Sequence, residues 1–147
     1  MKWVFTAPGV VETIFQLLLV ALLHDIFFTF IHYVVHKVPS LRISHLRWHH
    51  ECPFDVGSSR CALASEGIEL AVRDLYSVIV PTYIMGYCGM PFNGHLWVPY
   101  YSLYSLWTMY VHTGVNKYHR LHYESNPNRN YGLYYITDYF MGTLNLD

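Results

Sequence analysis

A long uncharged stretch sets the strongest limit on how this chain can fold. Residues 75–116 contain no Asp, Glu, Lys or Arg. Turn-forming residues divide this stretch at Gly86, Gly89, Pro91 and Gly94. We therefore predict a transmembrane hairpin, with a first arm that begins near Ala62 and a second arm over about residues 96–112.

A second apolar segment precedes the hairpin. Residues 10–31 are mostly apolar and are long enough for a bilayer that needs roughly 20 helical residues. We expect this helix to continue to His36 and to end before Pro39, because proline disfavours helical geometry in the residue before it. Residues 41–50 then predict a short helix that is too polar to span a bilayer.

The remaining segment is polar and rich in tyrosine, and it begins at Lys117. It predicts a cap close to the membrane surface. The chain is therefore expected to be all-α and to form one domain over residues 1–147. The expected architecture is an integral-membrane helical bundle with about three spans and a cytosolic histidine-rich cap.

Basic residues indicate which side of the membrane the cap occupies. Three spans would place on one face Lys37, Arg42, Arg47, Arg60, Lys117, Arg120 and Arg129. Cytosolic loops carry an excess of Lys and Arg, so this face is predicted to be cytosolic. We expect an integral membrane protein of the endoplasmic reticulum if the source is eukaryotic, or of the inner membrane if it is bacterial.

Composition limits the function classes. The chain is 53% hydrophobic and 13% charged with a net charge of −1, and no basic stripe could neutralise nucleic-acid phosphates. Three cysteines without Cys-x-x-Cys spacing indicate neither a disulfide framework nor a thiolate zinc site. The mean hydropathy of +0.19 is modest, which keeps a soluble all-α domain open as an alternative.

The histidines fall into three groups with metal-ligand spacing. His32 and His36 are four positions apart, so they share one helical face. A second group repeats this spacing and consists of His45, His49 and His50. The third group consists of His112, Asn116, His119 and His122. These residues share one helical face if the last membrane helix continues past Lys117. The predicted topology brings all three groups to the cytosolic side.

Eight histidines are too many for one tetrahedral zinc ion and suit two metal ions with nitrogen-rich shells. Imidazole binds iron, zinc and copper, so the ligand type does not choose the metal. Two redox metals in an apolar setting would allow dioxygen activation and attack on a C–H bond. His95 falls at the opposite end of the hairpin, and His24 lies about 12 Å along the helix from His32, at about 1.5 Å per residue. Neither is a predicted ligand, although His24 and Asp25 are expected to form a buried polar pair.

The spacing of these groups resembles the fatty acid hydroxylase/sterol desaturase superfamily over residues 25–143. The first matching motif is Asp-x6-His-x3-His, from Asp25 to His36, and the second is His45-Leu-Arg-Trp-His49-His50. Further similar motifs are His112-Thr-Gly, His119-Arg-Leu-His122, Asn130-Tyr131-Gly132 and Asp138-x3-Gly142-Thr143. The resemblance implies a histidine-ligated dimetal centre, usually assigned as iron, that uses dioxygen and an external electron donor to hydroxylate or desaturate lipids.

On this basis we predict two metal ions, iron or, in purified protein, zinc. The predicted ligands are His32, His36, His45, His49, His50, His112, His119 and His122, with Asn116 as a further candidate. Asp25 and Asp138 would accept imidazole N–H bonds and fix ring orientation, and Glu69 is a weaker candidate for the same role. Tyr123 stands where the superfamily has a second adjacent histidine, which predicts a ligand-poor site that Asn116 could complete.

The expected substrate is a sterol or a fatty acyl or sphingolipid chain that enters from the bilayer. The expected electron donor is a cytochrome b5- or ferredoxin-like protein. A carotenoid-ring hydroxylase is the main enzymatic alternative. A non-catalytic metal-binding or scaffolding membrane protein is the alternative from a different class. The sequence does not choose between hydroxylation and desaturation, and it leaves open whether the chain forms a homo-oligomer.

Overall fold

The computed structural model describes residues 9–51, 76–90 and 94–147. Over these ranges the regular secondary structure is helical and no strand is present, so the predicted all-α class is confirmed for this part of the chain. The predicted start of the hairpin near Ala62, the basic residue Arg60 and the candidate Glu69 lie outside the described residues.

The longest helix is α1, Val10–Lys37, with 28 residues. Among the described residues it is the one helix that is long and apolar enough to cross a membrane. Apolar side chains remain exposed along it, including Val11 at 82% and Leu18 at 67%. Such a surface suits lipid contact better than water contact.

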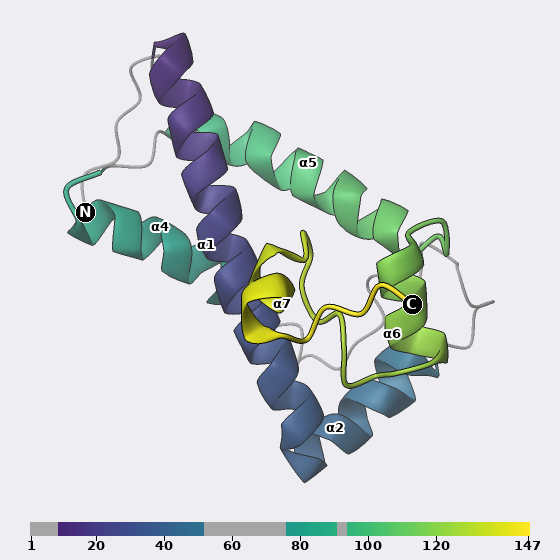
Figure 1. Ribbon diagram of the computed structural model, residues 1–147. Helices are drawn as coiled ribbons and strands as arrows, with labels where there is room; N and C mark the ends of the chain where they lie inside the picture. Colours follow the sequence, from purple (N-terminus) through teal and green to yellow (C-terminus); the bar gives the residue numbers. More distant parts are fainter. Residues whose placement is uncertain (1–8, 52–75, 91–93) are drawn as a thin grey trace.

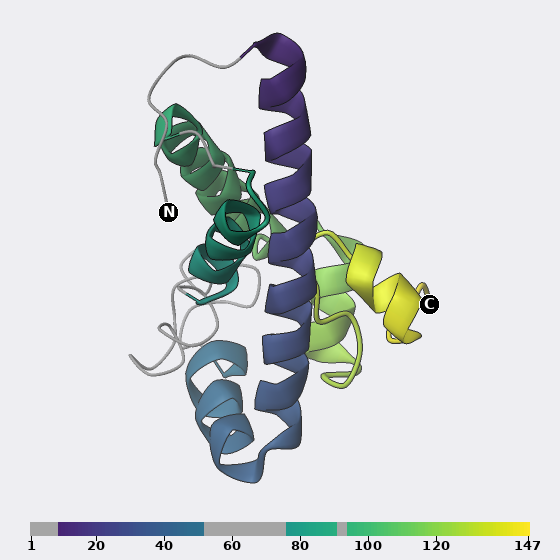
Figure 2. The same cartoon turned by 90° about the vertical axis from the view of Figure 1, so that its left-hand side faces the viewer.

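Two further helices correspond to the uncharged stretch. They are α4, Tyr76–Tyr87, and α5, Gly94–Val111. Figure 2 shows α4 beside the middle of α1 while α6 and α7 lie on its other side. The second predicted arm, residues 96–112, matches α5 closely, whereas the three-span topology stays a prediction.

Proline ends α1 as expected. Val38 has extended geometry, with φ −85° and ψ 116°, and Pro39 opens the next helix, α2, Pro39–His45. Proline suits a first helical position because its missing N–H needs no partner there. The chain therefore reverses at the bottom of Figure 1, and α2 returns beside the lower half of α1.

The short helix predicted over residues 41–50 contains an unexpected wide turn. After α2 the backbone forms a π-helix, η1, Leu46–His50. Its geometry is visible in the hydrogen bond from Glu51 N–H to Leu46 C=O, at 2.8 Å. A π turn changes the angular spacing of successive side chains. It therefore alters which neighbours the histidines of this segment can reach.

The predicted continuation of the last membrane helix past Lys117 is wrong. Helix α5 ends at Val111, and Gly114 has a positive φ of 76°, a conformation that glycine adopts without strain. A new helix, α6, Lys117–Glu124, follows Asn116, whose side chain accepts a hydrogen bond from His119 N–H. An asparagine oxygen that caps a helix start in this way satisfies an otherwise unpaired N–H.

Two small apolar clusters hold the helices together. The first joins α1, α4 and α5 through Val20, Met85, Leu96 and Tyr100. The second joins α1 and α5 to the C-terminal loop through Phe28, Tyr104 and Leu133. The last helix, α7, Ile136–Met141, packs against α1 (Figure 1). The lower half of α1 is thus left to face α2, η1 and the C-terminal segments.

Candidate metal centre

All eight predicted histidine ligands gather into two groups in which the possible ligand atoms lie within 4.8 Å of one another. We call the first group the five-histidine cluster, and it contains His32, His36, His45, His50 and His122. We call the second the three-histidine cluster, and it contains His49, His112 and His119. Seven of these side chains are buried and His50 is half-buried. The described residues could therefore hold two metal ions, as the sequence predicts.

The five-histidine cluster draws on three segments that converge in the lower half of the molecule (Figure 1). On α1, His32 and His36 place their rings 5.0 Å apart, as the four-residue spacing on one helical face requires. The Nε2 atoms of His32 and His45 are 3.1 Å apart. The ring of His122, from α6, lies 4.9 Å from the rings of both α1 histidines.

The three-histidine cluster lies between η1, the end of α5 and α6. His112 Nε2 is 3.4 Å from His49 Nε2 and 3.1 Å from His119 Nε2. Neighbouring residues in the sequence serve different clusters here: His49 joins this group while His50 joins the other. The wide turn of η1 lies at this division. The motif spacing alone does not predict this partition.

Backbone carbonyls fix the tautomers of three ligands. The Nδ1 atoms of His32 and His112 each lie 2.7 Å from a carbonyl oxygen, that of Tyr131 and that of Thr108. His122 Nδ1 lies 2.6 Å from the carbonyl oxygen of Arg129. A carbonyl only accepts, so Nδ1 carries the proton in each ring and Nε2 is left with a lone pair. Each of these Nε2 lone pairs can bind a metal ion or accept a proton from a neighbouring ring, and the Nε2–Nε2 distances of 3.1 Å are compatible with a shared metal ion.

His36 gives independent support for a bound cation. Its side chain is 1% exposed, and neither ring nitrogen has a hydrogen-bond partner among the described residues. Leaving a buried polar group unsatisfied costs about 1–3 kcal/mol. A metal ion coordinated by one nitrogen removes much of this penalty, so the environment of His36 fits a ligand better than a structural side chain.

The two carboxylates that the sequence predicts to orient imidazoles accept hydrogen bonds from a loop instead. Asp25 accepts hydrogen bonds from the Tyr134 and Thr137 N–H groups and from the Thr137 hydroxyl. Asp138 holds the same loop from its other end. It accepts bonds from Tyr131 N–H, Gly132 N–H and the Thr143 hydroxyl. They do not hold the imidazoles through these bonds. Instead they hold the loop whose Tyr131 carbonyl orients His32.

This loop fits α1 closely. A Cβ atom at Gly132 would lie 2.7 Å from Asp138 Oδ2 and 2.7 Å from Thr29 Oγ1, so the position accepts only glycine without movement. Burial raises the pKa of Asp138, against the opposing effect of its three hydrogen bonds. Burial also raises the pKa of Tyr131 to about 12, so that hydroxyl keeps its proton at neutral pH.

The other polar candidates have different partners. The Asn116 oxygen accepts from His119 N–H at 3.0 Å and from the Tyr135 hydroxyl at 2.9 Å, so both of its lone pairs are used away from a metal. His24 is not paired with Asp25 as predicted: its two ring nitrogens are hydrogen-bonded to the Tyr100 hydroxyl at 2.6 Å and the Ser77 hydroxyl at 3.2 Å. His95 is exposed on α5, away from both histidine groups.

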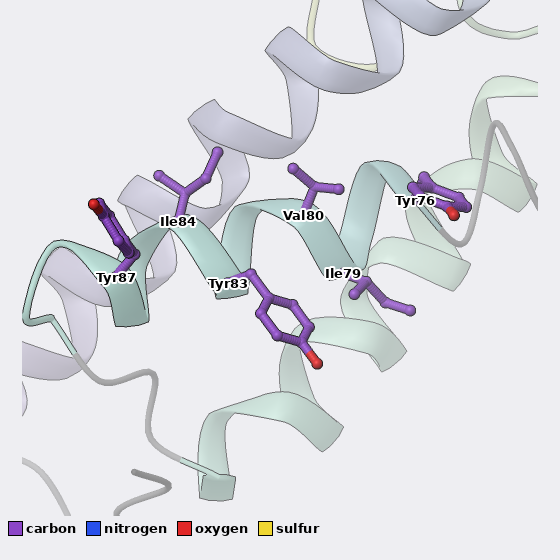
Figure 3. Close-up of a pocket in the computed structure, with 6 residues that line it drawn as sticks. All are labelled: Tyr76, Ile79, Val80, Tyr83, Ile84 and Tyr87. Atoms are coloured by element: carbon purple, nitrogen blue, oxygen red, sulfur yellow. The ribbon is translucent and has the colours of Figure 1, made fainter. Parts of the chain in front are cut away.

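An apolar groove lies apart from the metal centre, along α4. It has a volume of about 620 Å³ and is lined by Tyr76, Ile79, Val80, Tyr83, Ile84 and Tyr87 (Figure 3). None of the eight clustered histidines lines it. The groove is therefore not the candidate metal site.

The acceptors that orient the histidines carry little sequence signal. Any residue presents a carbonyl, so the roles of Thr108 and Arg129 were not predictable from residue type. Tyr131 belongs to the Asn-Tyr-Gly motif, which marks the loop but not the atom that is used.

Comparison of the chain with protein-family models, with curated proteins and with solved structures gives no match.

Proposed function

We propose that this chain is a membrane oxidoreductase that binds two iron ions in its two histidine clusters and uses dioxygen to hydroxylate or desaturate a lipid. One observation carries the proposal: eight imidazoles from distant segments meet in two groups with their ligand atoms within 4.8 Å. Two bound iron ions supply the dioxygen and electron chemistry that amino-acid side chains alone do not perform.

The protein's own residues supply position and exclude water. The carbonyl of Tyr131 and the carbonyl of Thr108 hold one ring of each cluster with Nε2 inward. Burial of the histidines keeps solvent away from the site. Oxygen chemistry on an unactivated C–H bond benefits from such a shell, because water competes with substrate and quenches reactive species.

The membrane part of the proposal rests on α1 and on charge. Its apolar surface suits a bilayer, and His36 of the five-histidine cluster lies at its C-terminal end, near Lys37 and Arg42. A substrate from the bilayer would then reach the site from the apolar side. An external donor of the cytochrome b5 or ferredoxin type would approach from the cytosol, where the exposed basic residues favour an acidic partner.

Metal and product analysis tests the activity. Protein purified in mild detergent should contain two iron ions per chain, and cells that express it should contain an oxidised lipid that is absent with His49→Ala. Oxidised carotenoid rings would identify the runner-up enzyme instead. Tight metal binding without any oxidised product would favour a non-catalytic metal-binding protein, and folded protein without metal would refute both.

Cysteine labelling tests the sidedness. Single cysteines at Gly89 and Arg129, in a cysteine-free background, should react with an impermeant reagent from opposite sides of a sealed vesicle. Arg129 should be reached from the cytosolic side because the basic residues predict that orientation. Reaction of both positions from one side would overturn the three-span arrangement.

A further inference from the structure

Tyr123 occupies a central place between the two clusters. It follows His122 directly on α6. Its ring centroid lies 4.9 Å from that of His119, 5.3 Å from that of His49 and 5.9 Å from that of His112. The tyrosine therefore contacts every ring of the three-histidine cluster.

These separations match those between the members of the cluster itself. The rings of His112 and His119 are 4.3 Å apart, and those of His49 and His112 are 5.2 Å apart. The Tyr123 ring therefore lies nearly as close to the three histidines as they lie to one another.

The five-histidine cluster also contacts the ring. Tyr123 stacks on His50 with a centroid distance of 4.4 Å and an interplanar angle of 16°. Its ring is also 5.8 Å from that of His122. Ring contacts with five histidines leave the Tyr123 ring little freedom to turn, so both clusters restrict its orientation.

The two clusters offer different numbers of ligand atoms, and the smaller one has room for an oxygen ligand. One group offers five nitrogen atoms and the other offers three. Three protein ligands leave coordination positions open, and a phenolic oxygen is a hard donor that suits iron(III). The Asn116 oxygen, which the sequence suggests for this place, is already bonded to His119 N–H and the Tyr135 hydroxyl.

We propose that the phenolic oxygen of Tyr123 is the fourth protein ligand of the metal ion in the three-histidine cluster. The proposal rests on the proposed function in that it requires a metal ion there. When the oxygen binds iron(III), an Fe–O bond forms, the phenolic O–H bond breaks, and the proton leaves to solvent with no change in oxidation state. The tyrosine would stabilise the oxidised metal ion and lower its reduction potential.

Iron(III) phenolates absorb visible light through charge transfer from oxygen to metal, which gives a direct test. Purified protein loaded with iron and oxidised in detergent should show such a band and two iron ions per chain. Tyr123→Phe keeps the stacking on His50 but has no oxygen. It should lose the band and fall toward one iron ion per chain. Tyr123→His should restore two iron ions without the band.

Tyr131→Phe is the matched control. Tyr131 is also buried and lies 5.4 Å from the ring of His36 in the five-histidine cluster, so its loss perturbs the same centre. That variant should keep the band. Two bound iron ions without a phenolate band, or a band that survives Tyr123→Phe, would overturn the tyrosine ligand and leave the proposed function standing. Protein that binds no iron would overturn both proposals.

Discussion

The Nδ1–H group of His32 donates a hydrogen bond of 2.7 Å to the carbonyl oxygen of Tyr131, across 99 positions of sequence. This contact fixes the orientation of a ring on α1 from the C-terminal loop. The loop is in turn fixed by Asp25 and Asp138. Ring orientation at the five-histidine cluster is therefore a tertiary property and does not belong to α1 alone.

Metal binding should stabilise the fold through His36. His36→Leu should unfold at a temperature no lower than wild type in the presence of a chelator, because leucine leaves no buried ring nitrogen unsatisfied. With metal, the wild type should gain stability by linkage, about 2.7 kcal/mol at roughly 100 times the dissociation constant, and the variant should gain less. Thermal unfolding followed by circular dichroism with and without metal measures both effects.

The control for His36 is His95→Leu, which changes an exposed histidine outside the clusters. It should show the full metal-dependent gain of the wild type. An equal gain in His36→Leu would mean that His36 does not bind the metal.

Gly132→Ala should disturb both the loop and the metal centre. The added methyl group meets two oxygen atoms at 2.7 Å, and overpacking of this kind costs about 1–3 kcal/mol. Displacement of the Tyr131 carbonyl should also lower metal content. Gly9→Ala is the matched control, because a Cβ atom there meets nothing within 4 Å. Comparable stability and metal content in the two variants would contradict the close fit of the loop against α1.

His24 should contribute to stability and not to metal binding. Both of its ring nitrogens are bonded to hydroxyl groups, and Tyr100 provides the shorter contact. A double-mutant cycle of His24→Leu and Tyr100→Phe should give a coupling energy on the order of 1 kcal/mol. Metal content should stay at the wild-type level in all three variants. Loss of metal from folded His24→Leu would show that this histidine belongs to the centre.

The carboxyl of Asp138 should make stability depend on pH. Burial raises its pKa in the folded chain above the ordinary value of 3.8, so the folded state holds the proton more tightly than the unfolded state. The resulting stabilisation is complete below pH 3.8 and is lost as pH rises through the raised pKa. The unfolding free energy of metal-free wild type, measured relative to Asp138→Asn, should therefore fall with rising pH and then level off. A difference that grows with pH would mean that hydrogen bonding outweighs burial.

The sequence predicted part of the gathering of the histidines because their spacing within one helix is a local property. The four-residue separation of His32 and His36 places them on one face of any helix, and the stop at Pro39 follows from proline geometry. The sequence contains two signals for the break between α5 and α6, although the helical spacing of the histidines favoured one continuous helix. Gly114 suits a helix end, and Asn116 suits a helix start.

The partition into five and three ligands was not predictable in the same way. It coincides with the π turn of η1, which separates His49 from His50, and no residue type in Leu46–His50 requires such a turn. The role of the loop that positions His32 was also not predictable from the sequence, because its bonds to Asp25 and Asp138 join distant segments through backbone N–H groups. Tertiary contacts of this kind depend on how whole helices pack.

The bond between His32 and the Tyr131 carbonyl also sets an order of events during synthesis. Helix α1 leaves the ribosome while the C-terminal loop is still untranslated. His32 and His36 are then exposed without the carbonyl and the α6 histidine that complete their surroundings. In the proposed function, the surroundings of the five-histidine cluster are complete only when Asp138 has been made and the loop has closed over α1, so we expect metal loading to be a late step of maturation.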